Sequence, residues 1–213
     1  MDFLTMLTTM LGGIKITLLV FTVTAVCALP LGLLVCSGRI SKWPVLRAVI
    51  DVYILIMRGT PLLLQLIFIY YGLPNWGITL DRLPAALITF VINYAAYFAE
   101  IFRGGFVSID PGQYEAGQVL GLSRSQTFYR VILPQLIKRI MPPIGNELIT
   151  LVKDTSLVYI LALGDVLRIA KTTAGSMVSQ LPYLAAALIY LGLIIVLTVI
   201  LKQTEKRYSY YEG

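Results

Sequence analysis

The chain has 213 residues, of which 58% are hydrophobic and 13% are charged, with a net charge of +6 and a mean hydropathy of +0.83. An average globular domain has about 25% charged residues, so this composition predicts one all-α integral membrane domain, residues 1–213, with about five transmembrane helices of about 20 residues each. The sequence has no His, which excludes His-based catalysis and His-metal sites, and its two cysteines, Cys27 and Cys36, share one apolar run that offers no disulfide framework or metal-ligand spacing.

The N-terminal part predicts a short helix followed by a first membrane span. Residues 14–35 are long and apolar enough to be that span. A cleaved signal peptide is the alternative, but the run is long for one and Lys15 is its only nearby base. Residues 1–13 could form an interfacial helix of open role. Its apolar residues at helical spacing are Phe3, Leu4, Leu7, Met10 and Leu11.

The predicted second span, residues 48–72, contains the polar interruption Arg58-Gly59-Thr60-Pro61. Pro61 removes a helical hydrogen bond, Gly59 frees the backbone, and Arg58 places a charge at membrane depth. Such a break needs protein or water around it. Arg58 has two interpretations, a direct role in a substrate pathway or a structural ion pair with a neighbouring carboxylate.

The predicted third span, residues 85–102, has a polar face on an otherwise apolar helix. Asn93, Tyr97 and Glu100 recur at separations of three and four residues and therefore share that face. Asn93 and Tyr97 lie deep enough to line a pathway. Glu100 lies at the cytoplasmic end beside Arg103, where a local ion pair is favoured over contact with substrate.

Residues 110–134 form a polar stretch that predicts two short helices joined at an angle, which we call the elbow. Asp110 with Gln113 predicts a capping box for the first helix, and Gly121 suits a left-handed residue at its end. Ser123 with Gln126 predicts a second capping box. Near the end of the second helix lies Pro134.

The predicted fourth span, residues 144–163, concentrates polar residues at membrane depth, which indicates pairing or function. Asn146, Thr150, Lys153 and Asp154 are predicted to line one side of it. A Lys153–Asp154 pair is the structural alternative, but adjacent helical residues point about 100° apart, which favours a site facing a cavity.

The remaining chain predicts an outer loop or short helices at residues 162–181 and a fifth span at residues 182–201. Most of the 17 Lys and Arg residues fall in segments 37–47 and 103–143 and at the C-terminus. Because basic loops stay in the cytoplasm, the N-terminus is predicted outside and the C-terminus inside. Dispersal of these bases among loops excludes a nucleic-acid surface.

Several of these residues resemble a known family. Glu115-Ala116, then Gly121, then Val131 and Leu133-Pro134 resemble the EAA signature of importer permeases that work with ATP-binding-cassette (ABC) ATPases. Gly117 stands where that signature has its second Ala, and Val131 where it has Ile.

Two further segments, residues 58–61 and 153–156, resemble the branch of that family that carries polar amino acids such as histidine, arginine and glutamine. The resemblance implies a type I ABC importer transmembrane domain in a bacterial inner membrane, with residues 110–134 as cytoplasmic coupling helices. The residues expected to contact the ATPase are Tyr114, Glu115, Ala116, Gly121, Ser123 and Phe128.

The same resemblance implies partners: a dimer of cytoplasmic ATPase subunits, a second permease copy, an extracytoplasmic solute-binding protein and membrane lipid. The chain has no Gly-Lys dipeptide and therefore no Walker A loop, so we predict no enzymatic activity and no cofactor or metal in this chain. ATP and Mg²⁺ are expected in the ATPase.

A zwitterionic substrate needs a cation for its carboxylate and acceptors for its ammonium group. Lys153 or Arg58 is predicted to bind the carboxylate, and Asp154, Asn93 or backbone carbonyls the amine. The predicted substrate-binding residues are Arg58, Thr60, Asn93, Tyr97, Glu100, Lys153, Asp154, Thr155 and Ser156. Basic, glutamine-like and cystine-like ligands stay open. An ion-coupled secondary transporter is the alternative function; it would need core carboxylates but no docking elbow.

Overall fold

A computed structural model describes residues 3–208, so the extreme termini lie outside the described residues. Within that range the chain is helical, without β-strands, as predicted. The elements are α1 (Phe3–Leu11), α2 (Ile14–Arg39), α3 (Pro44–Gly59), α4 (Leu62–Ile67), the π-helix η1 (Phe68–Gly72), the 3₁₀-helix η2 (Leu73–Trp76), α5 (Arg82–Val107), α6 (Gly112–Val119), α7 (Arg124–Thr127), the π-helix η3 (Phe128–Ile132), α8 (Leu133–Asp154), the 3₁₀-helix η4 (Thr155–Leu161), α9 (Val166–Met177) and α10 (Leu181–Tyr208).

Among the described residues, three helical stretches are long and apolar enough to cross a membrane: Thr5–Arg39, Arg82–Val107 and Leu181–Lys206. A fourth is reached only if α3 and the segment Leu62–Trp76, which are bent by 104° at residues 60–61, count as one span. The predicted fourth span falls on α8 and η4. It is not among these stretches because α8 carries charged residues along its length. By length and composition, residues 3–208 therefore contain three or four spans, fewer than the five or so that were predicted.

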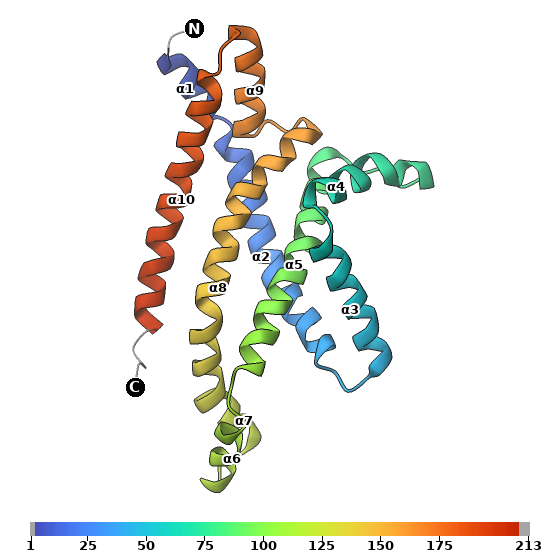
Figure 1. Cartoon of the computed structure of the whole chain (residues 1–213), viewed down its shortest axis with the longest axis vertical. Coiled ribbons are helices and arrows are strands. Elements are labelled where there is room, and N and C mark those ends of the chain that lie inside the picture. Colours follow the sequence, from blue (N-terminus) through green and yellow to red (C-terminus); the bar gives the residue numbers. More distant parts are fainter. Residues whose placement is uncertain (1–2, 209–213) are drawn as a thin grey trace.

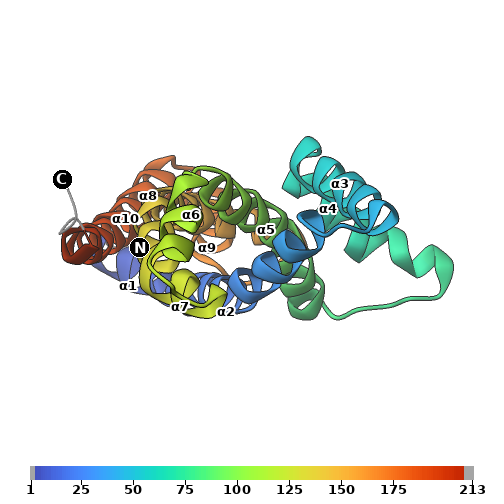
Figure 2. The same ribbon diagram turned by 90° about the horizontal axis from the view of Figure 1, so that it is seen from below.

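The centre of the bundle is the close packing of α2 on α5, two helices that cross along much of their length (Figures 1 and 2). Small residues permit this approach. A Cβ on Gly32 would lie 2.7 Å from the Phe98 Cβ and 3.0 Å from the Ala95 carbonyl oxygen. Ala28 and Ala99 are fully buried in the same core. Small residues are typical of helix contacts in membranes, where packing rather than hydrophobicity holds helices together.

A second core fixes the N-terminal helix. Met6 and Met10 of α1 are buried against Val166 and Ala170 of α9 and against α10. The predicted N-terminal helix is present as α1 (Phe3–Leu11), and the first two residues of the predicted range lie outside the described residues. Protein covers its buried face, and Leu11 is exposed. In Figure 1, α1 and α9 lie at the end of the molecule opposite α6 and α7. Which end faces the cytoplasm stays a prediction.

The elbow confirms two of the predicted local signals. Gly121 has φ +69°, the left-handed conformation that favours glycine. The Ser123 N–H donates to Gln126 Oε1 at 2.8 Å, and the Gln126 N–H donates to Ser123 Oγ at 3.2 Å, which completes the second capping box.

The first predicted capping box is wrong. Asp110 Oδ1 does accept a hydrogen bond from the Gly112 N–H at 2.7 Å, but the helix begins at Gly112. Gln113 does not bond back to the cap. Its Oε1 instead accepts from Gln135 Nε2 at 3.0 Å, a contact with α8 that no local pattern reveals.

The prediction that the second elbow helix ends near Pro134 is wrong. Helix α7 continues through η3 into α8 without interruption, and Pro134 lies in the first turn of α8. The Leu133 N–H donates to the Phe128 carbonyl in a widened π turn. This turn accommodates a proline that has no N–H and whose ring would otherwise clash with the carbonyl four residues earlier. The same arrangement recurs where η1 precedes Pro74.

Candidate functional site

The break between α3 and α4 leaves a backbone carbonyl without its helical partner, and side chains replace it. The Met57 carbonyl would normally accept from residue 61, but Pro61 has no N–H. Asn93 Nδ2 donates to this carbonyl at 2.8 Å and Gln65 Nε2 at 3.0 Å. The predicted interruption is therefore a fixed structure, supported from both α4 and α5.

Gln65 is the central residue of this support. Its Nε2 also donates to Thr60 Oγ1 at 2.8 Å and to the Thr60 carbonyl at 3.2 Å, while its Oε1 accepts from Asn93 Nδ2 at 2.9 Å. Gln65 is absent from the predicted site, although a lone amide in the apolar run after Pro61 was the available signal. Asn93, predicted to contact the substrate amine, donates its amide hydrogens to the Met57 carbonyl and to Gln65 Oε1.

A cavity of about 460 Å³ opens beside the break, between α3, α4, α5 and α8. It gathers polar groups from α3, the break at residues 60–61, α5 and α8, whereas α4 contributes Leu62 and Leu63. Its lining residues are Arg58, Gly59, Thr60, Pro61, Leu62, Leu63, Asn93, Tyr94, Tyr97, Glu147, Thr150, Asp154 and Leu157. Five of the predicted substrate-binding residues are thus brought together: Arg58, Thr60, Asn93, Tyr97 and Asp154.

The cavity contains one base and two acids. The Arg58 guanidinium carbon lies 5.2 Å from the centroid of the Tyr97 ring, a cation–π distance. Asp154 Oδ2 accepts a hydrogen bond from the Tyr94 hydroxyl at 2.8 Å. Glu147 has no ion pair or hydrogen bond of its carboxylate within residues 3–208. The lining therefore contains one more acidic side chain than basic ones.

Four predicted substrate-binding residues lie elsewhere. Lys153 is exposed and does not line the cavity, because it points away from the side of α8 that Asp154 occupies. Thr155 is fully buried and donates to the Val152 carbonyl at 2.7 Å, and Ser156 is outside the lining as well. Glu100 belongs to an ion cluster next to the cavity.

This ion cluster joins three helices at the same end of the bundle. Glu100 accepts from Arg103 at 3.1 and 3.2 Å, which confirms the predicted local pair, and it also contacts Arg39. Arg58 Nη1 lies 3.4 Å from Glu100 Oε2, and Arg39 Nε lies 2.9 Å from Asp51 Oδ1. The structure confirms the ion pair of Arg58 with a carboxylate, and Arg58 also lines the cavity, where its role in a substrate pathway stays a prediction.

The face of α8 that meets the cavity matches the predicted one at Thr150 and Asp154 but not at Asn146 and Lys153. Glu147, Thr150 and Asp154 line the cavity, a set at positions i, i+3 and i+7 that lies on one side of a helix. Asn146 and Lys153 are exposed on another side. Glu147 and Tyr94 were missing from the prediction, and Thr150 was predicted on this side of the helix but not among the substrate-binding residues.

The elbow presents an exposed surface at the far end of the molecule (Figure 1). The predicted coupling residues Glu115, Ala116, Gly121 and Ser123 are exposed there. Tyr114 and Phe128 line a groove of about 380 Å³ between α6 and α7. Two apolar residues outside the predicted coupling set, Val119 and Leu120, are 88% and 75% exposed at the tip of the elbow. Exposed apolar side chains in such a position are typical of a protein contact.

At the opposite end, Asp165 is a fully buried carboxylate that caps α9. Its oxygens accept from the N–H groups of Leu167 and Arg168 at 2.9 and 3.2 Å, and from the Tyr190 hydroxyl at 3.3 Å. Burial raises the pKa of the Asp165 carboxyl from 3.8 to about 6, in opposition to these hydrogen bonds, which lower it.

This pKa predicts how stability depends on pH. The folded chain holds the Asp165 proton more tightly than the unfolded chain, so its contribution is greatest below pH 3.8 and is lost as pH rises to about 6. Relative to Asp165→Asn, which stays neutral, the natural chain should lose up to about 3 kcal/mol between pH 4 and 7. Thermal unfolding of both proteins in detergent measures this. If the stabilities of the two proteins changed by the same amount between pH 4 and 7, the predicted role of Asp165 would be contradicted.

Comparison with known proteins adds independent information. Residues 28–210 match the family model described as "Binding-protein-dependent transport system inner membrane component". The chain is 40% identical to the Bacillus subtilis arginine transport system permease protein ArtQ over 92% of this chain and 91% of that protein. It is 37% identical to the Escherichia coli glutamine transport system permease protein GlnP over 93% of this chain and 92% of that protein.

Solved structures agree with these sequence matches. A crystal structure of an amino acid ABC transporter with histidines superposes with a TM-score of 0.88 at 33% identity, covering 97% of this chain and 99% of that one. An inward-facing structure of the methionine ABC transporter MetNI superposes with a TM-score of 0.77 at 19% identity, over 98% and 99% of the two chains. At that identity, the second match supports the fold alone.

Proposed function

The chain belongs to the family of binding-protein-dependent transport system inner membrane components, and we propose that it is the membrane permease subunit of an ATP-driven importer of polar amino acids. Relatives named as amino acid permeases support this proposal over nearly their whole length. The observation that carries it is the pairing of a polar cavity at the helix break with an exposed elbow at the far end.

The charges of the cavity favour an amino acid with a cationic side chain. Glu147 and Asp154 lie two helical turns apart on one face of α8 and can each take a cationic group, the α-ammonium or the side chain. Arg58, held between Tyr97 and Glu100, binds the α-carboxylate. A ligand of net charge +1 neutralises one base and two acids, whereas a neutral amino acid leaves one carboxylate unpaired.

We propose partners for the two functional surfaces. The elbow docks on a cytoplasmic ABC ATPase subunit, through Tyr114, Phe128 and the exposed tip at Val119 and Leu120. ATP and Mg²⁺ bind in that subunit, so this chain needs no cofactor. A second copy of the permease completes the passage, and an extracytoplasmic solute-binding protein delivers the amino acid to a multi-pass protein of the bacterial inner membrane.

Calorimetric titration of the purified chain with arginine, lysine and glutamine tests the substrate class. We expect arginine or lysine to bind more tightly than glutamine, and Glu147→Gln or Asp154→Asn to weaken binding at least about tenfold, because a charge-assisted contact contributes about 1.5–3 kcal/mol.

Lys153→Ala is the matched control, because it removes a neighbouring charge that lies outside the cavity. It should leave affinity unchanged. Tighter binding of glutamine than of arginine, or a loss in Lys153→Ala equal to that in Asp154→Asn, would contradict the assignment of the two carboxylates.

A further inference from the structure

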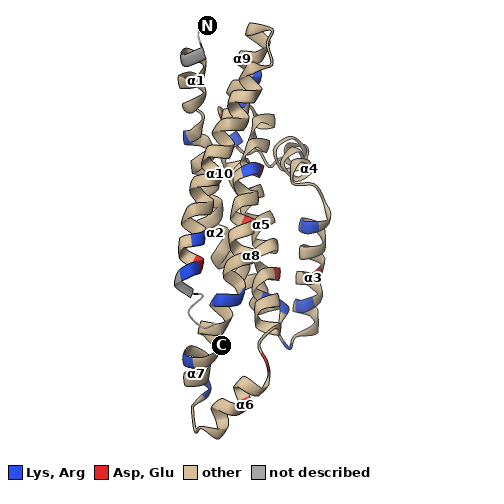
Figure 3. Ribbon diagram, turned by 60° about the vertical axis from the view of Figure 1, so that its left-hand side comes forward, with Lys and Arg blue, Asp and Glu red and all other residues tan. Residues whose placement is uncertain are grey.

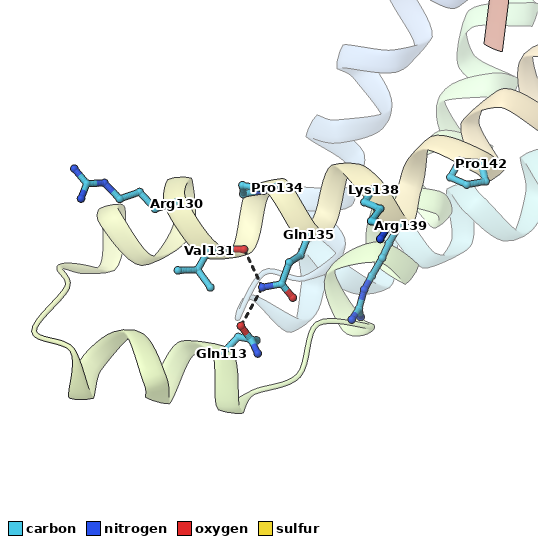
Figure 4. Close-up of a pocket in the computed structure, with 8 residues that line it drawn as sticks. All are labelled: Gln113, Arg130, Val131, Pro134, Gln135, Lys138, Arg139 and Pro142. Atoms are coloured by element: carbon cyan, nitrogen blue, oxygen red, sulfur yellow. Dashed lines mark hydrogen bonds between the residues drawn. The ribbon is translucent and has the colours of Figure 1, made fainter. Parts of the chain in front are cut away.

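A second pocket, of about 690 Å³, lies between α6 and the first turns of α8 (Figure 4). We call it the basic pocket. It is separate from the cavity at the helix break and shares no residue with it. Its lining residues are Gln113, Arg130, Val131, Pro134, Gln135, Lys138, Arg139 and Pro142.

The basic pocket carries three cationic side chains and no acid. Arg130, Lys138 and Arg139 make no ion pair and no hydrogen bond through their side chains in the part of the chain that the structure describes. Lys138 and Arg139 follow Gln135 along α8, whereas Arg130 points outward at the far rim (Figure 4). Three unneutralised cations in one pocket indicate an anionic ligand.

Two amides give the pocket a fixed wall. Gln135 Nε2 donates to Gln113 Oε1 and to the Val131 carbonyl, both at 3.0 Å. The bond to Gln113 ties α8 to α6 across the pocket, the bond to Val131 fixes the Gln135 side chain on its own helix, and the dashed lines in Figure 4 mark both. A pocket whose wall is already held together needs little rearrangement to bind a ligand.

The depth of the pocket can be judged from α10. A Cβ on Gly145 would lie 3.6 Å from Glu205 Oε1 and from Leu201, so residue 145 of α8 is level with the point where the apolar run of α10 gives way to charged residues. Lys138 lies seven residues earlier on α8, about 10 Å further along the axis. The lipid headgroup layer is roughly 5–8 Å thick on each side. Pro142, at the inner edge of the basic pocket and about 5 Å from residue 145 along the axis, therefore lies within the headgroup layer, and Lys138 lies just beyond that layer.

Other basic residues gather toward the same end of the molecule, on α7 and at the lower end of α3 in Figure 3. The exposed apolar tip at Val119 and Leu120 lies on α6 and the turn beyond it, away from Lys138 and Arg139. A protein that docks on the tip would not need to enter the pocket. The pocket therefore stays open to contact with the membrane surface.

We propose that the basic pocket binds the phosphate group of an anionic phospholipid, with Lys138 and Arg139 as its principal ligands. Basic pockets between membrane helices suit such headgroups, and Lys and Arg are the usual phosphate-binding side chains. The bound lipid lies against the α6–α8 contact and so holds the elbow at a fixed angle to the bundle. This inference does not depend on which amino acid the cavity takes.

Native mass spectrometry of the full chain, equilibrated with phosphatidylglycerol or with phosphatidylcholine, tests the proposal. We expect one phosphatidylglycerol to be retained per chain under conditions that remove phosphatidylcholine. The double variant Lys138→Gln/Arg139→Gln should bind it about 30-fold more weakly, since each basic residue near the membrane surface contributes about a factor of five.

Lys42→Gln/Arg47→Gln is the matched control, because it removes the same charge from the α2–α3 region outside the pocket. It should retain the lipid. A third arm supplies phosphatidylcholine with inorganic phosphate, and retention of phosphate there in place of lipid would overturn the assignment to a headgroup. Equal lipid loss in both double variants, or displacement of the lipid when the ATPase subunit is added, would also overturn the proposal.

Discussion

Gly121→Val is expected to lower ATP-driven uptake at least about tenfold while the chain stays folded and binds its amino acid normally. Gly121 has φ +69° and a Cβ there would meet no atom within 4 Å, so the effect comes from the backbone alone. A β-branched residue in the left-handed region is strained by about 1–2 kcal/mol. The turn between α6 and α7 then relaxes to another angle, and the elbow no longer fits its partner.

Uptake by proteoliposomes and substrate binding by calorimetry, measured on the same preparation, separate the two effects. We expect uptake to fall at least about tenfold, a loss of 1.4 kcal/mol or more in coupling. Gly121→Asn should restore much of it, because Asn tolerates the left-handed region. Gly164→Val makes the same change near the opposite end of the bundle, where a Cβ meets nothing and φ is not positive, and should be neutral. Normal uptake by Gly121→Val would refute this role of the turn.

Gln65→Leu should collapse the support of the helix break. The change removes the donor to Thr60 Oγ1 and the Thr60 carbonyl, one of the two donors to the Met57 carbonyl, and the acceptor of Asn93. Each buried polar group left without a partner costs about 1–3 kcal/mol. We therefore expect a melting temperature lower by on the order of 5 °C and a large loss of amino acid affinity.

The melting temperature in detergent and a calorimetric titration with arginine measure the two consequences together. Gln203→Leu, on the exposed side of α10, is the matched control and should change neither. If Gln65→Leu bound arginine as tightly as the natural chain, the break would not need this amide, and the cavity would have to be positioned by other contacts.

The helix break was predictable because its causes are local. Pro61 and Gly59 interrupt a helix wherever they occur in one, and Arg58 in an apolar run marks a polar surround. What holds the break was not predictable in the same way. Asn93 reaches Met57 across 36 positions in the sequence, and that contact depends on how α5 packs against α3.

The same difference between local causes and distant contacts explains which predictions for the elbow were correct. The predictions for Gly121 and Ser123 were correct because each conformation depends only on residues of its own turn. The capping box at Gln113 failed because a distant residue, Gln135, provides a competing partner. The prediction for Pro134 was wrong because a π turn immediately before this residue allows the helix to continue.

The assignment of α8 shows the limit of spacing arguments. Asp154 and Lys153 were both predicted to face a cavity, although adjacent residues on a helix point about 100° apart. Only the packing of α8 against α5 decides that Asp154, bonded to Tyr94, faces inward and Lys153 does not. Sequence spacing predicts which residues share a face, but the neighbouring helices decide which face lines the site.

The most direct test of the account is uptake of labelled arginine by proteoliposomes that contain this chain, its ATPase partner and the solute-binding protein. We predict that arginine accumulates only when ATP is hydrolysed, and that accumulation is lost in Glu147→Gln/Asp154→Asn. Accumulation driven by a proton or sodium gradient without ATP would contradict the account and would instead identify the chain as an ion-coupled secondary transporter.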